Sequence, residues 1–138
     1  MSASVEALAL LEASPPVRVY DDEPSLPAEV SAEDIRGRIS GLEIAADAAL
    51  FSALAAEFGF PSHFGANWDA LLDSLRDIGA GGPAPTSVWL IVDDAGAMLA
   101  KAPRTASLLI ETWTIAALWW AARGVPFQLC LLIPKPVR

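Results

Sequence analysis

The chain has 138 residues, 54% of them apolar, which suits one folded domain with a hydrophobic core and excludes disorder throughout. Its formal net charge of −8 favours basic protein partners and argues against direct nucleic-acid binding, because the phosphates would be repelled. With one cysteine and one histidine, the chain can form neither an intramolecular disulfide nor a zinc site of four Cys and His ligands.

The first third of the chain shows the weakest pattern. Residues 1–14 predict a short amphipathic helix, and VRVY at 17–20 alternates in the manner of a short strand. Residues 21–34 are acidic and hold two prolines, which predicts an exposed connector. We therefore expect residues 1–33 to form an N-terminal extension and residues 34–138 to form the domain.

A clearer series of elements begins with IRGRISG at 35–41, whose alternation predicts a strand. Asp47 is placed to cap a helix whose apolar residues recur at helical spacing until Gly59 ends it. A second helix is predicted over 68–78, and GAGGPAP at 79–85 breaks the chain after it.

The second half of the chain continues the alternation. SVWLIVDD at 87–94 is an apolar run that predicts a strand buried on both faces. Residues 95–99 predict one helical turn, and residues 104–123 predict a long helix that is apolar on nearly all sides. PFQLCLLI at 126–133 predicts a third strand. Strands that alternate with helices predict an α/β domain with a parallel sheet.

No segment is predicted to target or cross a membrane. The N-terminal residues lack the basic start of a signal peptide, and the apolar region 108–133 is interrupted by Glu111 and Arg123. Cys130 lies in this region and is expected to be a small buried side chain. We therefore expect a cytoplasmic protein without a membrane span.

The second predicted helix carries a row of acidic residues. Asp69, Asp73 and Asp77 are four residues apart and share an arc about 80° wide on a helical wheel. Asn67 is well suited to cap the start of the helix. The apolar residues occupy a different arc, so the helix has a core face and an acidic face; the core face holds Trp68, Leu71, Leu72, Leu75 and Ile78.

The acidic row has an ordinary and a functional interpretation. In the ordinary one, Asp69 stabilises the positive end of the helix dipole, and Asp77 is solvated surface. Like charges four residues apart cost only a few tenths of a kcal/mol, which a folded protein tolerates. In the functional one, Asp73, flanked by like charge and offset only by Arg76, belongs to a rigid row that binds a cationic partner.

The segment before this helix is compact. Gly65 permits a tight turn that brings His63 and Phe64 to the start of the helix. Phe64 is expected to pack against the helix core. His63 is either ordinary surface or a side chain beside the acidic row, whose carboxylates favour the charged form of the ring.

The stretch PSHFGANWDALLDSL resembles the signature of the barstar family, intracellular inhibitors of secreted microbial ribonucleases. The resemblance covers about residues 34–134 and implies a barstar-like α/β fold with a small three-stranded parallel sheet packed with helices. The longer N-terminus is similar to that of inhibitors of the ribonuclease Sa type. The matching motif residues are Pro61, Phe64, Gly65, Asn67, Asp69 and Asp73.

The resemblance implies a role for several residues. Asp73 would take the place of a substrate phosphate in the nuclease active site and accept charge-assisted hydrogen bonds there. Asp69 would make a second contact on the same face. His63 stands where the family often has an aromatic residue that packs on the nuclease, and its ring could stack in the same way. The backbone at Gly65 and Ala66 would press against the partner.

The remaining predicted contacts lie at the two ends of the helix, where Asn67 supports the turn and Arg76 and Asp77 complete the binding surface. The sequence departs from the family at Leu72, where a tryptophan is common. It departs again in the last helix, where Trp119 and Trp120 stand in place of an acidic contact. The resemblance therefore leaves the particular nuclease open.

Other functions use the same acidic face. An immunity protein for a nuclease toxin domain would bind in the same way, and an acidic scaffold for some other basic protein would need no single essential carboxylate. Paired glycosidase carboxylates lie about 5 to 9.5 Å apart across a substrate, whereas Asp69 and Asp73 point the same way from one convex helix. We therefore expect a basic ribonuclease or nuclease toxin as partner, no enzymatic activity, no metal and no cofactor.

Overall fold

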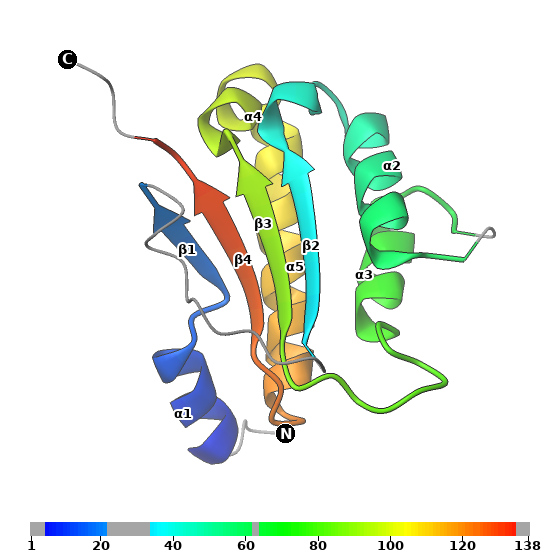
Figure 1. Ribbon diagram of the computed structural model, residues 1–138, viewed down its shortest axis with the longest axis vertical. Coiled ribbons are helices and arrows are strands. Elements are labelled where there is room, and N and C mark those ends of the chain that lie inside the picture. The colour runs from blue at the N-terminus through cyan, green and yellow to red at the C-terminus, as the bar shows by residue number, and fades with distance from the viewer. Residues whose placement is uncertain (1–4, 22–33, 62–63, 135–138) are drawn as a thin grey trace.

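The computed structural model describes residues 5–21, 34–61 and 64–134 (Figure 1). In these ranges helices and strands alternate over most of the chain, as predicted. The elements are α1 (Val5–Ala13), β1 (Val17–Tyr20), β2 (Ile35–Ser40), α2 (Asp47–Phe58), α3 (Trp68–Arg76), β3 (Val88–Asp93), α4 (Ala95–Lys101), α5 (Pro103–Ala121) and β4 (Phe127–Leu132), and a 3-10 turn (Gly41–Glu43) follows β2.

The described strands form one parallel sheet in the order β1-β4-β3-β2. The expectation of three strands is wrong, because β1 joins the sheet beside β4, with Val17 opposite Leu129. A four-residue alternating segment cannot form a stable strand alone, so its place depends on the free edge that β4 offers at the other end of the chain. The division of the chain at residue 34 remains a prediction.

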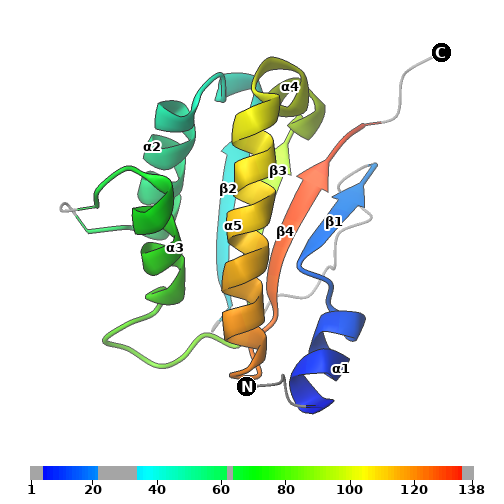
Figure 2. The ribbon, with the colours of Figure 1, turned by 180° about the vertical axis from the view of Figure 1, so that it is seen from behind.

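Helices α3 and α5 lie together on one face of the sheet (Figure 2). Five of the six residues of β3 are buried, which confirms a strand covered on both faces. The core on the helical side contains Leu50 and Leu54 of α2, Leu71 of α3 and Leu109 of α5, each with no exposed surface. A buried Leu side chain contributes about 1.5–3 kcal/mol, so this shared core holds α3 in a fixed position.

Aromatic side chains fill the centre of this core. The Trp113 ring of α5 stacks on Phe127 of β4 with 4.3 Å between ring centroids, and its Nε1 donates a hydrogen bond to the Phe127 carbonyl over 3.2 Å. Phe58 packs against β2 at Gly37, where an added Cβ would lie only 2.7 Å from the Phe58 ring. The glycine therefore lets α2 approach the edge strand closely.

Several helix boundaries differ from the prediction. Helix α3 ends at Arg76 rather than at residue 78, and α4 runs to Lys101 instead of making a single turn. Asp47 is the first residue of α2 and not its cap, because the cap position is Ala46. The Asp47 side chain bonds to more distant residues, described below. Gly59 ends α2 in a left-handed conformation (φ 64°), as predicted.

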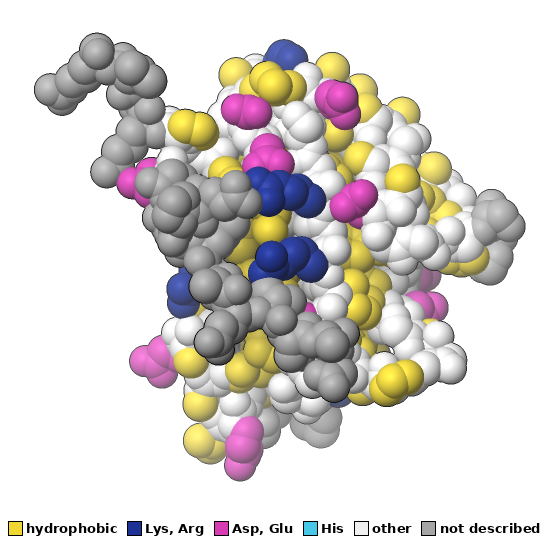
Figure 3. Space-filling model, viewed as in Figure 1, with side chains coloured by type: hydrophobic (Ala, Val, Ile, Leu, Met, Phe, Trp, Pro, Cys, Tyr) yellow, Lys and Arg dark blue, Asp and Glu magenta, His cyan; other side chains and the backbone are white. Residues whose placement is uncertain are grey.

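The opposite face of the sheet has a different character. Arg36 and Arg38 of β2 are exposed, and Lys and Arg side chains gather over the middle of this face in Figure 3. Beside them Trp89, Ile91 and Cys130 form a second, smaller apolar cluster. Cys130 has no exposed surface, which confirms the prediction of a buried side chain. Burial raises the pKa of the thiol to about 11, while the charges of nearby arginines act in the opposite direction.

None of the described helices is both long enough and apolar enough to cross a membrane.

Candidate functional site

Helix α3 is built as its sequence predicts. The Asn67 side chain accepts a hydrogen bond from the Ala70 N–H over 2.8 Å, which satisfies one of the free donors at the helix start. Leu71 and Leu75 are fully buried against the core. The helix is therefore anchored by its cap and by its apolar face, and its opposite face is left for other contacts.

The three aspartates occupy that opposite face. Asp69, Asp73 and Asp77 are all exposed. Asp77 lies just beyond the last helical turn, and its N–H donates to the carbonyls of Asp73 and Ser74 over 3.1 and 3.2 Å. The predicted acidic row therefore exists and runs the full length of α3, from its first turn to its C-cap.

The turn before α3 differs in one respect from the prediction. The left-handed residue is Ala66 (φ 49°), not Gly65. Gly65 serves a different purpose, because an added Cβ would lie 3.2 Å from the Asn67 amide nitrogen, which donates to the Gly65 carbonyl. A left-handed alanine costs about 1–2 kcal/mol, so the turn is strained at an exposed residue.

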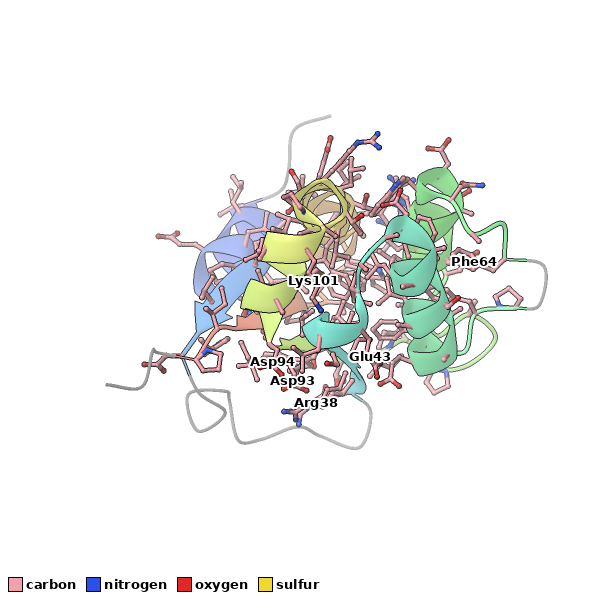
Figure 4. The ribbon with its side chains drawn as sticks, turned by 90° about the horizontal axis from the view of Figure 1, so that it is seen from above. Arg38, Glu43, Phe64, Asp93, Asp94 and Lys101 are labelled. Atoms are coloured by element: carbon pink, nitrogen blue, oxygen red, sulfur yellow. The ribbon has the colours of Figure 1, made fainter. Side chains whose placement is uncertain are left out.

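Phe64 secures this turn to the core, as predicted. Its ring lies beside α2 in Figure 4 and meets the rings of Phe51 and Phe60 with centroid distances of 6.3 and 5.1 Å. Trp68 also packs against Phe51, with ring centroids 5.0 Å apart. An aromatic cluster thus fixes both the turn and the start of α3. His63, another predicted contact, lies outside the described residues.

Asp47 makes two partly buried side-chain hydrogen bonds that the sequence does not predict. Its Oδ2 accepts a hydrogen bond from Trp68 Nε1 over 3.1 Å, and its Oδ1 accepts one from the Thr105 hydroxyl over 2.5 Å. The Thr105 bond is the main reason that the pKa of Asp47 lies below its ordinary value of 3.8; the Trp68 bond and the Arg104 charge act in the same direction, and burial opposes them. One carboxylate therefore joins the starts of α2, α3 and α5.

The two tryptophans at the end of α5 have different environments. Trp120 is buried, and its Nε1 donates to the Leu75 carbonyl of α3 over 3.0 Å. Trp119 is partly exposed, and the Arg123 guanidinium lies 3.4 Å from the centre of its ring. Trp120 therefore contacts α3 from the core side, while Trp119 and Arg123 lie at the surface.

Arg76 is less exposed than the three aspartates. Its side chain is partly buried, and its Nε is shielded from solvent without a hydrogen bond to the described part of the chain. In the same part of the chain, no group of three or more His, Cys, Asp or Glu side chains is placed to hold a metal ion.

Another charged cluster lies at the carboxyl end of the strands, where Figure 4 labels Arg38, Asp93 and Lys101. The Arg38 guanidinium donates two hydrogen bonds to the Asp93 carboxylate, over 2.7 and 2.8 Å. Lys101 donates to the Leu42 carbonyl over 2.9 Å. These contacts join β2 to β3 and the turn after β2 to α4, so their role in the fold is structural.

The fold and helix α3 define a small parallel α/β protein that displays a row of exposed aspartates on one helix. Residues 37–131 match the family model described as Barstar (barnase inhibitor), and the chain belongs to this family. The match confirms the resemblance seen in the sequence. No curated protein that was compared with the chain matches it.

Proposed function

We propose that this protein inhibits a ribonuclease by covering its active site with the acidic face of α3. The supporting observation is that the family match, over residues 37–131, includes a helix whose aspartates are exposed while its other face is locked in the core. An inhibitor needs such rigidity, since groups that are already in place lose little entropy on binding.

Asp73 is the central residue of this proposal. It lies in the middle of the row, where its carboxylate takes the place of a substrate phosphate and accepts hydrogen bonds from arginines of the nuclease. Asp69 makes a neighbouring contact, and Asp77 extends the negative field. Arg76, which lies between Asp73 and Asp77 in sequence, is at the edge of this surface. The whole row speeds association with a basic active site by electrostatic steering.

The turn supplies the second half of the proposed surface. Gly65 and Ala66 present exposed backbone beside α3, and Asn67 holds that backbone against the helix start. His63 stands next to them in sequence, where its ring would stack on the nuclease. The strained conformation of Ala66 is tolerated because the cap and the aromatic cluster fix the residues on either side.

The proposal is tested by inhibition of a panel of basic microbial ribonucleases, together with any nuclease encoded nearby. We expect stoichiometric inhibition by the protein and a loss of about 2–5 kcal/mol in binding for Asp73→Ala, which is roughly thirtyfold to several thousandfold. Glu111→Ala is the matched control, because it removes one exposed carboxylate from α5. It should change binding by less than about fivefold.

Two other functions share the site and are separated by the same experiment. An immunity protein would inhibit only its own toxin nuclease, again through Asp73. An acidic scaffold would lose little with Asp73→Ala, and its binding would weaken steeply with salt because many charges contribute. Inhibition that survives Asp73→Ala would refute the phosphate-mimic role.

A further inference from the structure

A pocket of about 560 Å³ opens beside the acidic row, between the end of α2, helix α3 and the residues that follow α3. Its described lining brings two kinds of side chain together. Phe58, Phe60 and Phe64 supply aromatic rings, and Asp73 and Asp77 supply carboxylates. Neither the predicted motif nor the proposed role of Asp73 accounts for a pocket of this composition.

The aromatic side of the pocket is preformed. The Phe58 and Phe60 rings are nearly parallel at 22°, with centroids 6.1 Å apart, and Phe60 meets Phe64 at 5.1 Å. Each ring is only partly buried, so part of its surface is available to a ligand. Because these rings also pack on the core, they need not rearrange to receive one.

The acidic side of the pocket is negatively charged. Asp73 and Asp77 are exposed and lie one helical turn apart, and the described lining contains no lysine or arginine to offset them. Helix α3 ends here, so the partial negative charge of its C-terminal carbonyls adds to that of the carboxylates. Arg76, which lies between the two acids in sequence, is not part of the described lining.

We propose that this pocket binds one arginine side chain of the partner protein; the identity of that partner as a ribonuclease rests on the proposed function. A guanidinium is planar, so it can stack on the phenylalanine rings while its N–H groups donate to a carboxylate. An apolar side chain would instead cover the two carboxylates without pairing them, which is unfavourable.

This assignment gives Asp77 a role separate from that of Asp73. Asp73 faces the nuclease active site, whereas Asp77 binds an arginine at its rim and thereby selects among nucleases. A partner with an arginine at that place pairs with Asp77 and stacks on the phenylalanine rings. A nuclease with an acidic residue there is rejected, because like charges would be forced together.

The pocket is tested on the isolated protein by two-dimensional NMR during titration with N-acetyl-L-arginine amide. We expect saturable shifts of the backbone amides of Gly65, Ser74, Gly79 and Ala80, which line the pocket. Asp77→Asn should weaken this binding about fivefold, the size of one exposed ion pair. Glu111→Gln is the matched control, because Glu111 is an exposed acid of α5 outside the described lining, and it should leave binding unchanged.

N-acetyl-L-norleucine amide serves as the uncharged probe. Equal binding of both probes, shifts at other residues, or an equal effect of the two substitutions would overturn the assignment. Asp77 is exposed and Asn has the same shape, so an unchanged urea midpoint will show that Asp77→Asn remains folded.

The outcome is separable from that of the proposed function. If the arginine probe binds as expected but no ribonuclease is inhibited, the proposed function fails and the pocket stands. If a ribonuclease is inhibited through Asp73 but the probe does not bind, the arginine pocket alone is refuted.

Discussion

Replacing Asp47 with alanine tests whether the stability of the fold around α3 depends on the two side-chain hydrogen bonds of Asp47. The substitution removes the acceptor of two hydrogen bonds, from Thr105 at 2.5 Å and from Trp68 at 3.1 Å. Hydrogen bonds to a charged group contribute about 1.5–3 kcal/mol each, and the longer bond lies at the weak end. Because Asp47 is only partly buried, water recovers some of the loss. We expect the free energy of unfolding to fall by about 2–4 kcal/mol.

The measurement is urea unfolding followed by tryptophan fluorescence. Glu111→Ala, at an exposed site of α5, is the control and should change stability by no more than about 0.5 kcal/mol. Thr105→Val should be coupled to Asp47→Ala, so that the double variant loses at least about 0.5 kcal/mol less than the sum of the single variants.

The pH dependence of this contribution has a definite sign. The pKa of Asp47 is lower in the folded protein than its ordinary value of 3.8, so the carboxylate favours folding only when it is ionised. The stability difference between the protein and Asp47→Ala should be complete above pH 3.8 and shrink as the pH falls through the lowered pKa. A difference that is below about 0.5 kcal/mol at pH 7, or that does not shrink in acid, would refute the reasoning.

Two further substitutions and one labelling experiment test local features. Asn67→Ala should lower the free energy of unfolding in urea by about 1 kcal/mol, because the cap bond to the Ala70 N–H is lost. An unchanged free energy would show that this cap does not stabilise the helix. Ala66→Gly should leave the free energy of unfolding unchanged or raise it by up to about 1 kcal/mol, because relief of the left-handed strain offsets the added entropy of the unfolded chain. A clear loss of stability would show that Ala66 is not strained. Cys130 should resist a thiol reagent at pH 8 in the native protein and react once urea unfolds it, because the thiol is buried and its pKa is about 11; rapid native labelling would contradict this.

Features that depend on residues close together in the sequence were predicted, whereas features that depend on distant residues were not. The cap at Asn67 and the two faces of α3 depend on residues within four positions of one another, so a helical wheel predicts them. The place of β1 depends on Leu129 of β4, and its membership of the sheet was missed. The bonds of Asp47 were missed for the same reason, since Trp68 and Thr105 share no local spacing with it.

The two parts of the proposed interface differ in the same way: the acidic row is set by nearby residues, and the pocket is set by residues distant in the sequence. Asp69 and Asp73 are placed by one helix and its cap, so any chain that keeps this short motif keeps the row. The pocket requires Phe58 and Phe60 from one segment to face Asp77 from another, which only the assembled core can arrange. Changes in the core can therefore alter the pocket while leaving the acidic row intact. Under the proposed function, inhibition and choice of nuclease can therefore vary independently among proteins that share the motif.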